Sequence, residues 1–247
     1  MNNHKISSLG LIFQKLMRIV DLVITYIFLI TAGTVIWLIC LIYLKIEVKG
    51  RENLPKNFTG HIFSANHQTL GDPFLIITLL RSMLFYALHP SQIAWNAPEL
   101  TNYFKTWLLK FIFRHLRCLP VRRGKMTPEM LNEFQRKVTK ILKHGCLLIF
   151  FEQTRTRDQN GEIGPAQSGL GKMVCDNHCP VIPIRIMGFN QILPVGSGWP
   201  RVSLWHRTKV SITIGQPMIF EPVIRQNHGQ KTWQAISDQV REAVLTL

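Results

Sequence analysis

The sequence has 247 residues, which suits one α/β domain of ordinary size with a small additional segment. A formal net charge of +15 at pH 7 accompanies 47% hydrophobic residues, a combination that indicates anionic membrane surfaces or phosphate-bearing substrates, with nucleic acid as the rival partner. The five cysteines are an odd number and one lies in an apolar run, which argues against a disulfide framework of the secreted kind, so we expect them to be reduced and mostly buried.

The first feature along the chain is an apolar run without a single charge, from Leu22 to Leu44. At about 1.5 Å per residue, a helix of this length crosses a hydrocarbon core of roughly 30 Å. A cleavable signal peptide is the alternative, but its apolar core would be shorter, at about 7 to 15 residues. Gly33 in mid-run and the apolar residues 9–20 would also suit a two-helix hairpin, and the basic residues on the two sides balance. We therefore expect a membrane helix or a helical hairpin, with its orientation open.

Beyond this run, short apolar segments alternate with amphipathic ones, which is the pattern of an α/β domain. We expect an N-terminal membrane anchor in residues 1–47 and a folded domain in residues 48–247. A helix is expected to begin near Asp72, with Asp72 as its N-cap and Pro73 as its first helical residue. Extended segments are expected at residues 61–65, 118–121, 146–151, 180–187 and 210–214, and further helices at residues 103–115, 128–143 and 233–244.

His67 and Asp72 stand five residues apart, where the strand ending at residue 65 gives way to this helix. On one continuous helix their side chains would point about 140° away from each other, so they can pair only if the chain bends between them. Gly71 supplies such a bend. A carboxylate that accepts the Nδ1 proton of a histidine leaves its Nε2 free to act as a base. The spacing alone is equally compatible with an N-cap role for Asp72 and a loop position for His67.

Four further segments follow in order along the chain. They are Leu119-Pro120-Val121-Arg122-Arg123-Gly124, Phe150-Phe151-Glu152-Gln153-Thr154-Arg155, Cys179-Pro180-Val181-Ile182-Pro183-Ile184 and Val210-Ser211-Ile212-Thr213-Ile214-Gly215-Gln216-Pro217. Together with Asn66-His67 and Asp72, which match an Asn-His-x4-Asp motif, the chain from about residue 48 to 220 resembles the glycerolipid acyltransferases of the 1-acylglycerol-3-phosphate acyltransferase type.

The resemblance implies a mixed, largely parallel central sheet flanked by helices, and a catalytic domain that transfers a fatty acyl group from acyl-CoA or acyl carrier protein to a hydroxyl of a lysophospholipid. It implies His67 as the general base with Asp72 as its partner, and substrate binding by Arg123, Glu152, Thr154 and Arg155. No cofactor is implied beyond the thioester co-substrate. The implied partners are membrane phospholipids and the lysophospholipid acceptor, and the implied location is the inner (cytoplasmic) membrane with the catalytic domain on the cytoplasmic side.

Three positions depart from the family pattern. Phe151 stands where the family has proline, Gln153 where it has glycine, and Arg122 where an acidic residue is common. Because glycine reaches positive φ values that glutamine avoids, we expect the turn after Glu152 to have a different backbone shape. These changes bear on the identity of the lysolipid acceptor more than on the chemistry.

Several alternatives stay open at this point. Glu152 at the end of an apolar strand needs a partner, and Arg155 is the nearest candidate for a structural ion pair. The basic residues around Arg123 would also fit a solvated turn, and the aromatic residues of 103–113 fit either a lipid interface or a core. Cys175, His178 and Cys179 form a poor tetrahedral set, so we assign no metal.

Two other classes of function compete with catalysis. A non-catalytic membrane protein that binds lipid through the same fold is motivated by the altered segment around Gln153. Nucleic-acid binding rests on charge alone and lacks a recognisable nucleic-acid module, so no nucleic-acid partner is expected.

Overall fold

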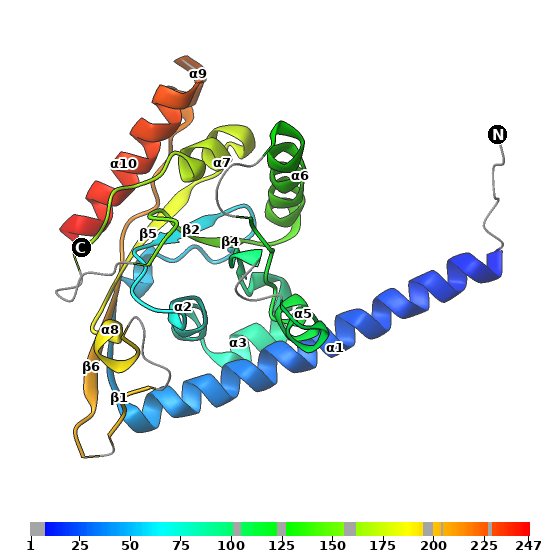
Figure 1. Ribbon diagram of the computed structural model, residues 1–247, viewed down its shortest axis with the longest axis horizontal. Coiled ribbons are helices and arrows are strands. Elements are labelled where there is room, and N and C mark those ends of the chain that lie inside the picture. Colours follow the sequence, from blue (N-terminus) through cyan, green and yellow to red (C-terminus); the bar gives the residue numbers. More distant parts are fainter. Residues whose placement is uncertain are drawn as a thin grey trace.

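The computed structural model describes residues 8–100, 105–122, 127–155, 162–194, 200–203, 205–226 and 229–247, and for residues 8–11 and 226 the backbone alone. Six strands in these ranges form one sheet in the order β1-β6-β5-β2-β4-β3 (Figure 1). All neighbouring strands are parallel except β5 and β6, so the predicted mixed, largely parallel sheet is confirmed. The strands are β1 Leu44–Lys49, β2 Ile62–Ala65, β3 Trp95–Asn96, β4 Leu147–Phe150, β5 Val181–Met187 and β6 Thr208–Ile214.

Helices connect these strands and cover both faces of the sheet. The α-helices are α1 Ser8–Tyr43, α2 Asp72–Leu80, α3 Met83–Leu88, α5 Trp107–His115, α6 Pro128–His144, α7 Gly169–Asn177, α8 Phe189–Ile192, α9 Glu221–Gln226 and α10 Gln230–Thr246, and the short 3-10 helices are η1 Arg51–Asn53 and η2 Pro90–Gln92. Helix α6 begins at the predicted residue because Thr127 caps it, accepting a hydrogen bond from the backbone N–H of Met130.

Alternation along the strands separates two hydrophobic cores. Phe63 and Ala65 of β2 point into the core shared with α1, α2 and α3, whereas Ile62 points into the core shared with α6, α7 and α10. Phe63 is fully buried, and burying such a side chain stabilises a fold by about 1.5–3 kcal/mol relative to exposing it. Because side chains of β2 pack into both cores, the strand fixes the position of the residues that follow it.

The N-terminal segment is one continuous helix, so the expected alternative of a two-helix hairpin is wrong. Residues Ile12–Tyr43 of α1 are long and apolar enough to cross a membrane by length and composition. Gly33 does not mark a turn. A Cβ at this position would lie 2.8 Å from the sulfur of Met83, so the glycine permits close packing of α1 on α3.

The end of α1 continues directly into the sheet. Helix α1 ends at Tyr43 and β1 begins at Leu44, so the expected division between residues 47 and 48 falls inside β1. Strand β1 pairs with β6 along its whole length, from Leu44 with Thr208 to Lys49 with Thr213. The five cysteines are all buried and unpaired, as expected.

Candidate active site

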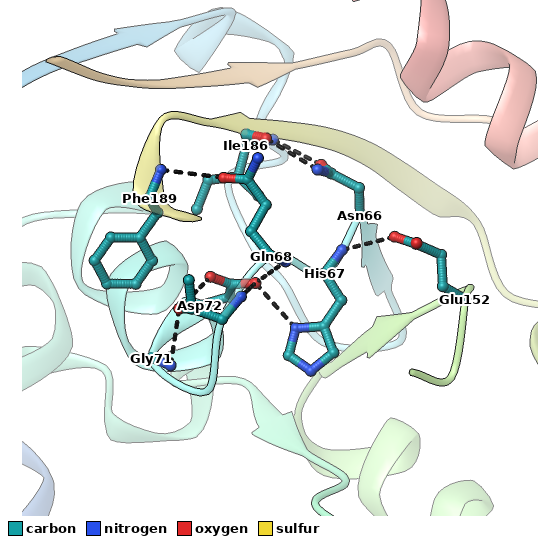
Figure 2. A network of polar contacts seen from close by, with 9 residues as sticks. Asn66, His67, Gln68, Gly71, Asp72, Glu152, Ile186 and Phe189 are labelled. Atoms are coloured by element: carbon teal, nitrogen blue, oxygen red, sulfur yellow. Dashed lines mark hydrogen bonds and ion pairs between the residues drawn. The ribbon is translucent and has the colours of Figure 1, made fainter. Parts of the chain in front are cut away.

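The candidate site lies in the loop that follows β2, at the carboxyl end of a strand between β5 and β4. The side chain of Asn66 pairs with the backbone of Ile186 in both directions, with its Nδ2 2.9 Å from the carbonyl oxygen and its Oδ1 2.8 Å from the nitrogen. Gln68 Oε1 accepts a hydrogen bond from the backbone N–H of Phe189 at 3.1 Å (Figure 2). Both neighbours of His67 are thus fixed to the β5–α8 connection, which sets the position of the histidine.

His67 and Asp72 form the predicted pair. The distance from His67 Nδ1 to Asp72 Oδ2 is 2.9 Å, and Asp72 is fully buried while the His67 side chain is 11% exposed. Because an ionised carboxylate only accepts hydrogen bonds, Nδ1 carries the proton and Nε2 of the neutral ring is left as an acceptor. In Figure 2 the second ring nitrogen points away from Asp72.

The carboxylate of Asp72 is held by more than the histidine. Its Oδ2 also accepts hydrogen bonds from the backbone N–H groups of Gln68 and Thr69, and its Oδ1 accepts one from the Thr69 hydroxyl at 2.8 Å. These bonds all come from the loop between the strand and the helix, so the bend itself orients the carboxylate. The predicted N-cap assignment is off by one residue, since Asp72 is the first residue of α2 and Gly71 is its cap.

Gly71 does not supply the bend through an unusual backbone conformation. Its φ of −85° and ψ of −12° are right-handed helical values that any residue adopts. The glycine is needed for space, because a Cβ there would come within 3.0 Å of the Phe189 ring. The predicted bend exists, but Gly71 is required by the close approach of α8 rather than by the bend itself.

Two residues at the end of β4 complete the surroundings of the histidine. The Phe150 ring stacks on the His67 ring with a centroid distance of 4.0 Å and an interplanar angle of 15°. Glu152 is buried, and its Oε1 accepts a hydrogen bond from the backbone N–H of His67 at 2.8 Å while its Oε2 accepts one from Gly164 at 2.9 Å. Among the described residues, these backbone groups rather than Arg155 are the partners of Glu152, so the suggested ion pair between Glu152 and Arg155 is wrong.

The expectation that the turn after Glu152 has a different backbone shape is wrong. Gln153 has a φ of 55°, so this glutamine takes the left-handed conformation that glycine adopts freely. Such a conformation costs an L-residue roughly 1–2 kcal/mol. Its side chain extends toward the start of α7, where a Cβ on Gly169 would lie 2.4 Å from Gln153 Nε2.

A pocket of about 320 Å³ opens beside the histidine. Its described wall combines His67 with apolar side chains from α2, β4 and α6, with two cationic side chains, Arg122 and Lys172, and with the buried carboxyl group of Glu99. Gln153 and Gly169 also line it. A histidine beside a largely apolar cavity with cationic side chains in its wall is suited to an amphipathic substrate with an anionic group.

The structure brings together some of the predicted site residues and not others. His67, Asp72 and Glu152 form one hydrogen-bonded group, whereas Thr154 is exposed, Arg155 is half-buried, and the described wall of the pocket includes neither. Arg123 lies outside the described residues. The sequence reasoning missed Lys172. It sits one turn inside α7, after Gly169 and Gly171, and only the fold reveals that this helix begins beside β4.

Within the described part of the chain, no group of three or more His, Cys, Asp or Glu side chains is arranged to hold a metal ion. Of the three residues considered for zinc, His178 instead pairs through Nδ1 with Glu221 Oε2 at 3.0 Å. The carboxyl pKa of Glu221 is lowered by His178 and Arg225.

The chain is similar to known proteins in sequence and in fold. A family model described as Acyltransferase matches residues 45–187. The chain is 26% identical over 155 residues to chloroplastic 1-acyl-sn-glycerol-3-phosphate acyltransferases of Brassica napus and Arabidopsis thaliana, over 63% of its own length and 41% and 39% of theirs. It thus spans about two fifths of the length of these curated relatives. The crystal structure of the 1-acyl-sn-glycerophosphate acyltransferase PlsC of Thermotoga maritima has a similar fold, with a TM-score of 0.58 and 22% identity over 87% of this chain and 75% of that one.

Proposed function

The chain belongs to the Acyltransferase family, and on this basis we propose that it transfers a fatty acyl group from an acyl thioester to the free hydroxyl of 1-acylglycerol-3-phosphate, giving phosphatidate. The observation that carries the proposal is the buried pair of His67 and Asp72 at the wall of the pocket. The names of the two plant relatives support this acceptor, and the cationic side chains of Arg122 and Lys172 in the pocket are compatible with its phosphate.

In the proposed reaction, Nε2 of His67 takes the proton of the acceptor hydroxyl as its oxygen attacks the thioester carbonyl carbon. The new C–O bond forms, the C–S bond breaks, and the proton passes from the imidazolium to the departing thiolate. Asp72 stabilises the imidazolium and keeps the ring in one tautomer, while the hydrogen bond from the His67 backbone N–H to the Glu152 carboxylate fixes the backbone that carries the ring. A positioned base of this kind contributes about 10² to 10⁴ in rate.

The phosphate group of the acceptor is assigned to this site because the charges are complementary. We propose that Arg122, Arg123 and Lys172 hold the acceptor phosphate, because cationic side chains form strong charge-assisted hydrogen bonds with phosphate oxygens. Glu152 is reassigned from substrate binding to positioning of His67, on its two bonds to backbone N–H groups. The donor is acyl-CoA or acyl carrier protein, and we assign the catalytic domain to the side of the inner membrane that holds these thioesters.

The direct test follows thiol release by the purified chain with 1-acylglycerol-3-phosphate and either thioester donor. We expect turnover by the parent chain, a loss of at least about 10² in kcat for His67→Ala, and no change for the matched control His144→Ala, an exposed histidine outside the pocket. The assay has a low protein background, because burial raises the pKa of the Cys118, Cys146 and Cys179 thiols to about 12.

Two results would contradict the proposal. Full activity of His67→Ala would remove the histidine from catalysis. Binding of the lysolipid by the parent chain without thiol release from either donor would favour the non-catalytic lipid-binding alternative.

A further inference from the structure

Residues 163–167 form a segment that lies between the end of β4 and the C-terminal helix α10. On one side, the backbone N–H of Gln167 donates a hydrogen bond to the carbonyl oxygen of Phe151 at 2.9 Å. On the other side, Nε2 of Gln234 in α10 donates one to the carbonyl oxygen of Ala166 at 3.0 Å. The segment therefore connects α10 to the residues that follow β4.

Arg241 of α10 binds the start of this segment. Its Nε donates a hydrogen bond to the carbonyl oxygen of Gly164 at 2.8 Å, and its Nη2 donates one to the carbonyl oxygen of Ile163 at 3.3 Å. Its third nitrogen, Nη1, lies 2.8 Å from Glu242 Oε1. Because the planar guanidinium group donates to three acceptors, the Arg241 side chain is held in one orientation although it is 27% exposed.

One peptide group connects Arg241 with the candidate site. The carbonyl oxygen of Ile163 and the N–H of Gly164 belong to the same peptide group, which accepts a hydrogen bond from Arg241. The N–H of this group donates to Glu152 Oε2 at 2.9 Å. The other carboxylate oxygen of Glu152 accepts a hydrogen bond from the backbone N–H of His67 at 2.8 Å (Figure 2). A continuous chain of hydrogen bonds thus runs from Arg241 to the backbone of His67.

The charges at the two ends of this chain strengthen its hydrogen bonds. A cation at the carbonyl oxygen polarises the peptide group, so its N–H becomes a stronger donor, and consecutive hydrogen bonds reinforce one another in this way. The acceptor is the buried carboxylate of Glu152, and hydrogen bonds to a charged group are stronger than those between neutral groups. Arg241 therefore strengthens the bond between the segment and the carboxylate.

Gly164 permits the close approach on which the chain of hydrogen bonds depends. A Cβ at this position would lie 2.9 Å from Glu152 Oε2, so the carboxylate occupies the space that a side chain would take. A larger residue would displace either the carboxylate or the segment. The bond between Gly164 and Glu152 is thus tied to the absence of a side chain at this position.

Helix α10 holds Arg241 in a fixed place. Ile236, Val240 and Val244 are fully buried along one side of the helix, in the core shared with α6 and α7. Figure 1 shows α10 packed beside α7. Helix α10 also lies beyond residues 45–187, which the family model matches, so the match itself assigns no role to Arg241.

We propose that Arg241 is a positioning residue, which acts through the peptide group between Ile163 and Gly164 and through Glu152 to hold the backbone of His67. The inference rests on the proposed function, because it concerns the base of the same reaction. Arg241 is not among the residues that line the described wall of the pocket, so its loss leaves the contacts of that wall with the acceptor in place. The consequence is a change in kcat rather than in KM.

The first experiment measures thiol release by the full chain and its variants in detergent. We expect Arg241→Ala to lower kcat about five- to tenfold, with KM for the lysolipid within about twofold of the parent value. Arg241→Lys keeps the charge and one donor, so we expect it to recover about half of the lost activity. The matched control is Arg207→Ala, because Arg207 also donates to two backbone carbonyl oxygens, of Leu41 and Leu44, and is absent from the described wall of the pocket.

The same assay separates positioning from a general loss of stability. In a chain that already carries Glu152→Gln, Arg241→Ala should change kcat by less than about twofold, because the path to His67 is already broken. An unchanged kcat in Arg241→Ala, or an equal fall with and without Glu152→Gln, overturns the inference.

The second experiment observes the His67 backbone without turnover, by nuclear magnetic resonance. With nitrogen-labelled histidine, the nine histidines of the chain give at most nine backbone amide signals, and His67→Ala identifies that of His67. Because a hydrogen bond to a carboxylate moves an amide proton downfield, we expect Arg241→Ala to shift the His67 signal upfield and Arg207→Ala to leave it in place.

The two experiments distinguish the failure of this inference from the failure of the proposed function. An unmoved His67 signal in Arg241→Ala, beside thiol release by the parent chain, overturns the role of Arg241 alone. Absence of thiol release by the parent chain overturns the proposed function and, with it, the effect of Arg241 on kcat.

Discussion

Two loops that follow neighbouring parallel strands differ in how they combine local and distant contacts. The loop after β2 orients Asp72 through bonds among residues 67–72 and is also fixed to residues 186 and 189, whereas the loop after β4 holds Glu152 and Gln153 through contacts with residues 67, 164 and 169. The first loop carries Asn66, His67 and Asp72, which resemble a family motif, whereas the second has Gln153 in a left-handed conformation. We propose that the first loop holds the reacting geometry and that the second shapes the surroundings of the acceptor.

Glu152 joins the two loops, so its replacement has the largest effect among the residues outside the His67–Asp72 pair. In Glu152→Gln the amide NH2 would face one of the two backbone N–H groups, of His67 or Gly164, that now donate to the carboxylate. We expect kcat to fall by about 10- to 100-fold with KM little changed, and the free energy of unfolding to fall by about 2 kcal/mol. Steady-state kinetics and denaturant unfolding in detergent measure both.

The matched control for this variant is Glu47→Gln. Glu47 lies on the edge strand β1, where Lys49 and Lys209 lower its pKa, and it is remote from the pocket. Wild-type kcat in Glu152→Gln would show that the two loops are not functionally linked.

Lys172 tests whether the second loop region selects the acceptor by charge. The ammonium group lies 2.9 Å from Asp176 Oδ2 and 4.5 Å from the centre of the Trp233 ring, at the wall of the pocket. We expect Lys172→Ala to raise KM for a phosphate-bearing lysolipid about five- to tenfold, with a smaller effect on kcat.

Lys137→Ala is the control, because Lys137 forms a similar pair with Glu133 on the exposed side of α6. An unchanged KM in Lys172→Ala, or an equal rise in both variants, would show that Lys172 does not contact the acceptor.

We expect the smallest effect from Gln153→Gly, which should raise the free energy of unfolding, whereas Glu152→Gln should lower it. Removing the side chain relieves the left-handed strain but increases the freedom of the unfolded chain, so we expect a net gain of about 0.5–1 kcal/mol in the free energy of unfolding. We also expect a change in the preference among lysolipid head groups, because the side chain lines the pocket. A loss of stability would mean that Gln153 makes contacts that outweigh its strain.

The sequence predicted the parts of the fold that depend on local pattern. Helix α6 begins at the expected Pro128 and ends one residue past the expected Lys143. This helix is predictable because its signals, the Thr127 cap and the apolar stripe, depend only on residues close together in the sequence. The pairing of His67 with Asp72 was predictable for the same reason, since the bend needed for it lies within five residues.

The parts that the sequence did not predict depend on residues far apart in the chain. In the sequence, Gly33 resembles a turn signal and Gly71 resembles a bend. In the structure, Gly33 makes room for Met83 and Gly71 makes room for Phe189. From the sequence, Arg155 is the nearest candidate partner of Glu152, but the Glu152 oxygens accept hydrogen bonds from the backbone N–H groups of residues 67 and 164. No local pattern carries this information.

A double-mutant cycle on His67 and Asp72 tests most directly whether the pair acts as one base. Asp72→Asn alone should lower kcat by about 10³, because the ring would lose its tautomer and its counter-charge. In a chain that already carries His67→Ala, the same substitution should change the remaining rate by less than about twofold. A further loss of about 10³ in the double variant would contradict the proposed mechanism, because it would show that Asp72 acts independently of His67.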